Sequence, residues 1–246
     1  MAECIHGLEV PLCDPCYPKA VVDKPRPVRA AAPRIPRVAA MSSSRKSINV
    51  GEQRIYHVTH IRNLASIIKT GALLPAVPAS DVVPVIDVSS ELTRELRLTA
   101  EVSPGESVAG YVPFYLAPNA FLWEELRRGA AEPRWSAAAK AASSADFVIL
   151  VSTVGDVGFG AVVTDGDAAG SVTRFATTAD AVDAMVRRLH DDESARLNAE
   201  ALVKGSFPFD AVQLIGVAND RIRDRVKGMV DGPKVAVYPP WFQPPE

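Results

Sequence analysis

Apolar and polar residues alternate with two different periods between residues 54 and 238, which predicts a domain of mixed α and β structure. Near-continuous apolar runs at 146–152 and 211–218 are typical of central strands buried on both faces. The predicted strands are 54–58, 111–116, 146–152, 160–164, 200–204, 211–218 and 234–238. Apolar positions at helical spacing predict helices at 60–70, 89–97, 120–128, 136–143, 178–190 and 219–228.

The glycine pattern excludes the common nucleotide-binding loops. Neither a Gly-x-Gly-x-x-Gly motif nor a Walker A sequence follows a predicted strand. Gly155, Gly158 and Gly160 lie between two predicted strands without a helix after them, so we expect a turn there. No internal repeat is visible in the sequence.

Residues 56–71, YHVTHIRNLASIIKTG, join a predicted strand to a predicted helix and concentrate polar side chains at the junction. His57 and Thr59 alternate with Tyr56 and Val58, which suits a strand with one face lining a cleft. Gly71 follows the last apolar position of the helix, where glycine commonly ends helices. The junction can hold a small polar ligand, although an ordinary core or capping histidine would fit the same pattern.

Three further motifs follow in order along the chain. Residues 94–97, RELR, lie on a short polar helix, residues 111–115 read YVPFY, and residues 198–208 read NAEALVKGSFP. With the opening H-x-T-H-x-x-N-L and the DGDAA at 165–169, this series resembles the DarT family of DNA ADP-ribosyltransferases over residues 54–240. The resemblance implies an α+β fold, with a split mixed β-sheet, surrounding helices and an NAD cleft.

Glu200 is the residue that the resemblance identifies as the catalytic glutamate, within A-E-x-L-V. Transfer of ADP-ribose expels a nicotinamide that is already cationic, through a transition state like the oxocarbenium ion of glycoside hydrolysis. A carboxylate near the ribose can stabilise that charge. Glu200 opens a predicted strand after a long irregular stretch, whereas Glu124, Glu125 and Glu193 lack such a context and are expected at the surface.

Arg97 is the second expected catalytic residue, because the resemblance gives it contact with NAD and help in removing a proton from the target base. A guanidinium is a poor base, so we expect it to stabilise the deprotonated base electrostatically, with Arg94 as the alternative. Tyr115 is placed to stack on the nicotinamide ring. The resemblance also implies contacts with NAD, as the substrate, from His57, Val58, Thr59, Ser66 and Leu74.

The acceptor is less well defined, because the family continues after its tyrosine with a basic residue and an S-P-M-L turn. This chain reads APNAFLW at 117–123, with Asn119 in place of the arginine that would meet DNA. Arg174, in the expected substrate-facing loop between Ser152 and Glu200, remains a candidate phosphate contact. Thymidine in single-stranded DNA is the expected acceptor. Guanosine in DNA, RNA, protein, or a catalytically inactive nucleic-acid-binding module are the alternatives.

The resemblance also implies a biological setting. An enzyme of this kind is a glycosyltransferase (pentosyltransferase), the toxin of a toxin–antitoxin or antiphage system, with a macrodomain antitoxin as its partner. The sequence has no apolar run long enough for a membrane helix and no apolar segment near its start typical of a secretory signal. We therefore expect a cytoplasmic protein.

The first fifty residues differ in composition from the predicted catalytic domain at 51–246. Residues 17–50 form a basic, Pro/Ala-rich linker, in which residues 17–47 carry +7 of formal charge although the whole chain carries −2. Such a linker can lie on nucleic-acid phosphates or act as a plain spacer.

All three cysteines lie within residues 1–16, together with a histidine. Three thiolates and one imidazole form a complete ligand set for tetrahedral zinc, and such a site can fold a peptide too short for its own core. Free or redox-active thiols are the alternative, whereas an odd cysteine count makes a disulfide framework unfavoured. The predicted structural zinc ligands are Cys4, His6, Cys13 and Cys16.

Overall fold

The computed structural model describes residues 48–76, 83–129 and 133–243. They belong to one compact unit, residues 47–246. The predicted zinc ligands and the basic residues 17–47 lie outside the described residues.

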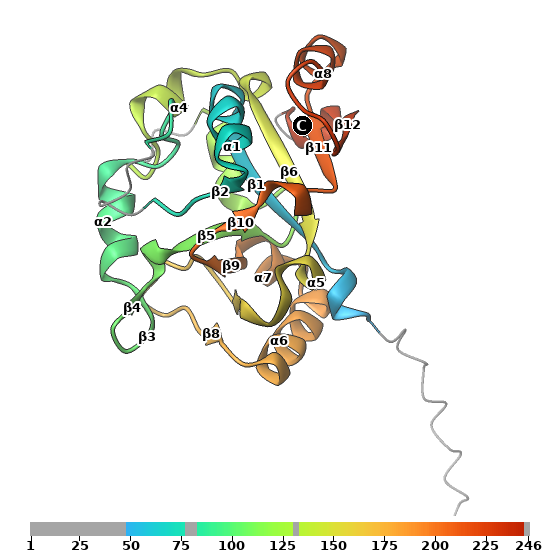
Figure 1. Cartoon of the computed structure of the whole chain (residues 1–246). Coiled ribbons are helices and arrows are strands. Elements are labelled where there is room, and N and C mark those ends of the chain that lie inside the picture. The colour runs from blue at the N-terminus through green and yellow to red at the C-terminus, as the bar shows by residue number, and fades with distance from the viewer. Residues whose placement is uncertain (1–47, 77–82, 130–132, 244–246) are drawn as a thin grey trace, which may run out of the picture. The chain divides into compact units, whose positions relative to one another are not determined.

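An eight-stranded mixed sheet forms the centre of the domain, in the order β12-β11-β6-β1-β5-β9-β7-β8 (Figure 1). β11 and β12 are parallel, and every other neighbouring pair is antiparallel. The sheet with its covering helices confirms the predicted α+β class. The strands are β1 (Arg54–His60), β5 (Tyr111–Tyr115), β6 (Phe147–Thr153), β7 (Ala161–Thr164), β8 (Phe175–Ala176), β9 (Glu200–Lys204), β11 (Leu214–Val217) and β12 (Lys234–Val237).

The seven predicted strands are all present, and β11 begins later than expected, at Leu214 rather than at 211. A 3₁₀ turn, η6 (Phe209–Ala211), occupies the start of the predicted segment. Two short ladders were not predicted, because two or three residues show no measurable period. They pair β2 (Ala72–Leu73) with β10 (Phe207–Pro208), and β3 (Glu101–Ser103) with β4 (Glu106–Ser107).

The predicted helices are all present with shifts of a few residues, and α1 ends as expected at Gly71, whose φ is 69°. The turn expected around Gly155 is instead the short helix α5, followed by a 3₁₀ turn at Gly158–Gly160. No helix of the described residues is long and apolar enough to cross a membrane. The helices are α1 (Leu64–Thr70), α2 (Glu91–Thr99), α3 (Phe121–Arg127), α4 (Ala137–Ala141), α5 (Val154–Val157), α6 (Ala179–Asp191), α7 (Glu193–Asn198) and α8 (Asp220–Lys227).

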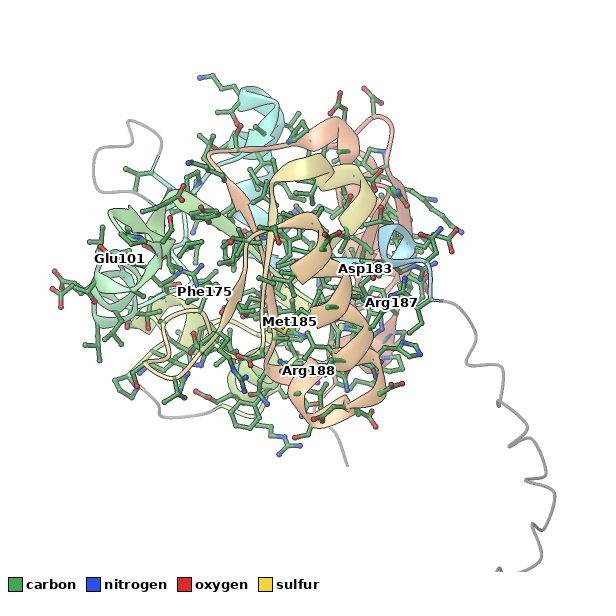
Figure 2. All side chains as sticks on the ribbon, turned by 90° about the horizontal axis from the view of Figure 1, so that it is seen from below. Glu101, Phe175, Asp183, Met185, Arg187 and Arg188 are labelled. Carbon is green, nitrogen blue, oxygen red and sulfur yellow. The ribbon has the colours of Figure 1, made fainter. Side chains whose placement is uncertain are left out.

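The helices cover both faces of the sheet, which explains why β6 is apolar from Phe147 to Val151. Leu150 packs in the cluster that contains apolar residues of α1, α6 and α8, whereas Ile149 packs in the cluster that contains those of α3 and α4. α6 buries one apolar face and turns Asp183 and Arg187 outward (Figure 2). Alternate residues of one strand thus serve two cores.

The sheet is split between β1 and β5. β1 pairs with β6 from Arg54 to His60, but its register with β5 contains only the pair Tyr56–Tyr115. Pro113 of β5 has no N–H to offer to a ladder, and its carbonyl oxygen instead lies 2.8 Å from His57 Nδ1. The two strands therefore separate beside His57, and the separation opens the candidate site.

Candidate active site

Helix α2 is attached to the domain by hydrogen bonds rather than by burial, since none of its residues is buried. At its N-terminal end, the Ser90 N–H and the Thr93 hydroxyl donate to Arg134 O at 2.9 and 2.8 Å. Near its C-terminal end, the Ser107 hydroxyl lies 2.9 Å from Arg97 O. These bonds hold the predicted RELR segment against β9.

Glu200 is the most completely enclosed carboxylate of the site, with 1% of its surface exposed. Its Oε1 accepts the Ala168 N–H at 2.9 Å, and its Oε2 accepts from Arg97 Nη1 at 3.1 Å. The Glu200 N–H donates to the buried Thr164 hydroxyl at 2.9 Å. The two expected catalytic residues therefore form one ion pair, in which both carboxylate oxygens have donors.

The surroundings of Glu200 differ from the sequence-based expectation in one respect. The expected irregular stretch before it is mostly regular, because α6 and α7 precede β9 with only Ala199 between α7 and Glu200. The irregular part of the segment that was expected to face the substrate is correspondingly shorter, and β7 and β8 are joined by the loop 165–174.

Burial raises the pKa of the Glu200 carboxyl, while the Arg97 guanidinium lowers it and the Asp167 carboxylate raises it. Tyr115 lies directly opposite Glu200 in the β5–β9 register. Burial also raises the pKa of the Tyr115 phenol, and the Glu200 charge adds to that shift. The phenol is therefore a neutral hydrogen-bond donor at physiological pH.

A cavity of about 570 Å³ opens at the separation of β1 and β5. Every predicted NAD contact except Arg97 lines it, and so does the alternative arginine, Arg94. Arg97 and Glu200 do not line it, but Glu200 is the β9 register partner of the lining residue Tyr115, and Arg97 donates to Glu200. The cavity lining includes His57, Val58, Thr59, Ser66, Leu74, Arg94, Tyr115 and Trp135.

The polar groups of β1 are oriented by bonds to neighbouring segments. His57 Nδ1 must carry the proton in order to donate to Pro113 O. Burial lowers the pKa of His57, so the ring is neutral and its Nε2 is left as an acceptor. Asn63 Nδ2 donates to Thr59 Oγ1 at 3.1 Å and to Ile86 O at 2.8 Å. Asn63 thus ties the strand to the opposite wall of the cavity.

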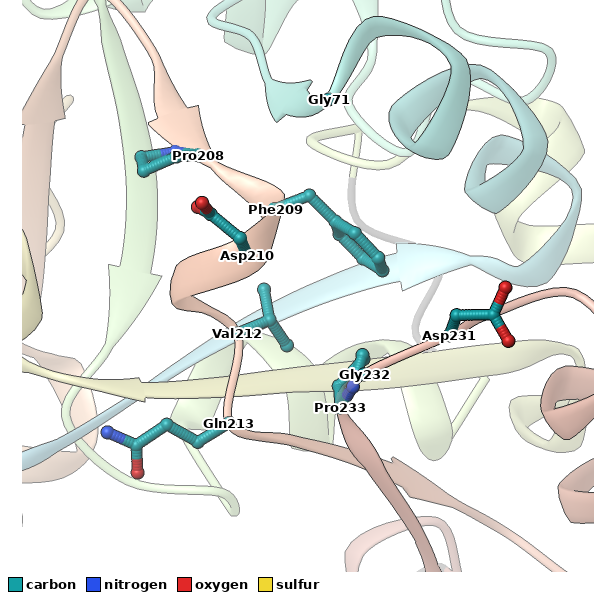
Figure 3. Close-up of a pocket in the computed structure, with 9 residues that line it drawn as sticks. All are labelled: Gly71, Pro208, Phe209, Asp210, Val212, Gln213, Asp231, Gly232 and Pro233. Carbon is teal, nitrogen blue, oxygen red and sulfur yellow. The ribbon is translucent and has the colours of Figure 1, made fainter.

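A second cavity, of about 590 Å³, lies beyond Gly71, between η6 and the turn before β12 (Figure 3). Phe209 and Val212 provide apolar surface, and the carboxylates of Asp210 and Asp231 are on its edge. It contains none of the expected NAD contacts. Among the described residues, no group of three or more His, Cys, Asp or Glu side chains is arranged to hold a metal ion.

Sequence reasoning missed three residues of the site. Thr164 ends β7, and Ala168 lies in the DGDAA motif that follows it, which was the signal for Ala168. Asn63 is the asparagine of the opening motif, which was its signal. Glu125 was expected at the surface, but its side chain is 10% exposed and accepts from Trp135 Nε1 at 3.0 Å. Arg174 is on the short loop as expected, 3.1 Å from Asp165.

Comparison with known proteins places these observations in a family. The family model described as DarT, ssDNA thymidine ADP-ribosyltransferase, matches residues 56–243. A DNA ADP-ribosyl transferase of Mycobacterium tuberculosis is 27% identical over 194 residues, which cover 72% of this chain and 81% of that protein.

Solved structures show the same fold. Thermus sp. 2.9 DarT in complex with ADP-ribosylated ssDNA matches with a TM-score of 0.63 and 23% identity, over 77% of this chain and 96% of that chain. The same Thermus protein in complex with NAD⁺ gives 0.59 and 24%, over 77% and 97%. Thermosipho africanus DarTG in complex with ADP-ribose gives 0.59 and 18%, over 77% and 51%. With a family match that runs from β1 to the end of the described fold, the chain belongs to the DarT family of NAD-dependent, single-stranded-DNA thymidine ADP-ribosyltransferases.

Proposed function

We propose that this chain transfers the ADP-ribosyl group of NAD to thymine in single-stranded DNA, with Glu200 as the catalytic carboxylate. The observation that carries the proposal is the buried Arg97–Glu200 pair beside Tyr115, which lines the cavity together with His57, Val58 and Thr59. NAD bound in this cavity with its nicotinamide ribose beside Tyr115 would bring the reacting carbon toward Glu200.

The nicotinamide end of NAD binds at the separation of β1 and β5. Beyond the pair Tyr56–Tyr115, the edge of β1 that faces β5 has no register partner in that strand. The backbone groups that alternate residues of 57–59 direct to this edge are suited to the nicotinamide amide, and His57 Nε2 can accept one of its N–H groups. The Tyr115 ring packs on the nicotinamide.

Two arginines have different roles in this proposal. Arg94 lines the cavity and so contacts the pyrophosphate, although it is also bonded to Asp87 at 2.5 Å. Arg97 keeps Glu200 ionised and oriented, since burial alone favours the protonated acid. Ser66 and Leu74, on the cavity wall, contact the remaining part of NAD.

The reaction breaks the bond between ribose C1′ and the nicotinamide nitrogen, and the electron pair leaves on neutral nicotinamide. The ionised Glu200 stabilises the positive charge that develops on the ribose. A ring nitrogen of the base then bonds to C1′, and its proton is released to water. A single-stranded base reaches the site without the few kcal/mol that flipping from a duplex costs.

The biological setting and the N-terminal segment complete the proposal. The chain acts as the toxin of a toxin–antitoxin pair, and a macrodomain protein removes the ADP-ribose that it attaches; the match to Thermosipho africanus DarTG supports this reading.

Cys4, His6, Cys13 and Cys16 bind one structural zinc, and the basic residues 17–47 contact DNA phosphates.

Incubation of the purified chain with labelled NAD and separate single-stranded DNA, duplex DNA, RNA and protein tests the proposed function. We expect label mainly on single-stranded DNA, and none with the Glu200→Gln variant. Label on RNA or protein alone would refute the assigned acceptor, and equal labelling by the variant would refute the role of Glu200.

A further inference from the structure

A second guanidinium–carboxylate pair lies beside the Arg97–Glu200 pair and has no role in the mechanism above. Arg134 Nη1 is 3.4 Å from Asp167 Oδ2. Both pairs surround one phenol: burial raises the pKa of Tyr115, Glu200 and Asp167 raise it further, and Arg97 and Arg134 oppose them. Four charged groups from four separate segments therefore meet around Tyr115, which lines the cavity.

The backbone on each side of the second pair is tied to the catalytic residues. Arg134 O accepts from Ser90 and Thr93 at the start of α2, the helix that carries Arg97, and the next residue, Trp135, lines the cavity. On the other side, Asp167 precedes Ala168, whose N–H holds Glu200 Oε1. The pair therefore bridges α2 and the loop 165–174 close to Glu200.

The two ion pairs differ in how far their side chains are exposed to solvent. The side chains of Arg97 and Glu200 are 15% and 2% exposed, whereas those of Arg134 and Asp167 are 37% and 36% exposed. An exposed pair with a long contact contributes little to stability, so it can open for a substrate. Asp167 Oδ1 also accepts the Ala169 N–H at 2.9 Å, so Asp167 stays in place when Arg134 moves.

The segment directly after Tyr115 supplies no cation for the acceptor base. Residues 116–123 contain neither Lys nor Arg. Arg97 already donates to Glu200. Glu125 Oε1 lies 3.2 Å from Arg134 Nε, and this contact is on the side of the guanidinium away from the one that Nη1 makes with Asp167. Arg134 thus has the partial exposure, the position and the charge needed to meet a polar base edge.

We propose that Arg134 contacts the acceptor base, donating to a base carbonyl oxygen and stabilising the anion formed when the neighbouring ring N–H loses its proton. This inference rests on the proposed function. The N–H bond breaks with release of the proton to water, and the nitrogen lone pair forms the new bond to C1′ as the nicotinamide bond breaks. The substrate class is a base with a ring N–H next to a carbonyl, which thymine and guanine have and adenine and cytosine lack. Asp167 is a positioning residue that holds Arg134.

The test compares the full chain with Arg134→Gln, Arg134→Lys and, as a control, Arg187→Gln. Arg187 is also an exposed arginine paired with an aspartate, Asp183, but it lies on α6 (Figure 2). Three quantities are measured: NAD affinity by calorimetry, NAD hydrolysis without DNA, and modification of a thymidine-containing single-stranded oligonucleotide between neutral and alkaline pH.

We expect Arg134→Gln to slow DNA modification by about 100-fold at neutral pH, the usual effect of removing one donor to a transition-state anion. The loss shrinks as pH rises, because alkali removes the base proton without help from the arginine. NAD affinity and NAD hydrolysis stay within about threefold of wild type, since neither involves the base. Arg134→Lys recovers part of the rate, and Arg187→Gln matches wild type.

Wild-type rates for Arg134→Gln, a parallel loss of NAD affinity, or a raised KM for DNA with an unchanged pH profile would each overturn this inference. The last result would identify a phosphate contact instead. Failure of the wild-type chain to modify any nucleic acid would overturn the proposed function and this inference with it. Modification by wild type together with an unaffected variant would overturn the inference alone.

Discussion

Replacement of Glu200 by alanine is the most direct test of the site, because two separable quantities should respond differently. Glu200 makes contact with Arg97 and Ala168 and does not line the cavity, whereas the proposed NAD contacts on β1, α1 and β5 do. A carboxylate that acts on the developing ribose cation stabilises the transition state more than bound NAD. We expect transfer to fall by about 10³-fold or more, equivalent to about 4 kcal/mol, with NAD affinity nearly unchanged.

The cost in stability follows from the same contacts. Breaking a buried ion pair typically costs about 3–5 kcal/mol when the remaining charge stays buried. Here the Arg97 side chain is 15% exposed and can be partly hydrated, and burial already disfavours the ionised Glu200, as its raised pKa indicates. We therefore expect Glu200→Ala to destabilise the fold by only about 1–2 kcal/mol, or to lower Tm by about 2–8 °C.

The assay uses labelled NAD and a single-stranded oligonucleotide, with calorimetry for NAD affinity and thermal denaturation for stability. Glu200→Gln is the matched variant, because its amide oxygen can still accept the Ala168 N–H while its charge is gone. Residual transfer above a few per cent of the wild-type rate in a folded, NAD-binding variant would refute the catalytic assignment.

The remaining predictions concern pH, metal and DNA. The raised Glu200 pKa predicts that kcat/KM falls on acidification at a pH above the ordinary value of 4.5. It also predicts that the free energy of unfolding of wild type, relative to that of Glu200→Gln, is greatest below pH 4.5 and decreases as pH rises through the raised pKa. Thermal denaturation at several pH values tests this. Metal analysis of protein purified without chelator should find about one zinc per chain, and a metal-free protein would contradict the predicted Cys/His site. Deletion of residues 1–47 should weaken DNA binding more than NAD binding and flatten its salt dependence, and an unchanged salt slope would reduce the segment to a spacer. For the full chain, single-stranded DNA should react much faster than the matching duplex, and equal rates would argue against a site that takes an unpaired base.

The sequence by itself determined the strands and helices whose periods are long enough to read. β6 is apolar from Phe147 to Val151 because both of its faces are covered, and Gly71 ends α1 because it adopts a positive φ without a Cβ clash. The missed α7 is six residues long, too short for a helical period to be distinguished. The family motifs likewise pointed to Glu200 and, in order along the chain, to residues that line the cavity.

Only the tertiary structure decided which of these residues meet. Arg97 and Glu200 are 103 positions apart, and hydrogen bonds that fix helix α2 to Arg134 and Ser107, rather than any local pattern, bring Arg97 to 3.1 Å from Glu200 on β9. The separation of β1 from β5 beside Pro113 turns a strand-to-helix junction into a cavity. Arg134 was unremarked in the sequence, because a single arginine after a proline has no periodicity and no motif. Its position near Glu200 depends on hydrogen bonds to α2 and a contact with a distant loop, and these exist only when the whole sheet has formed.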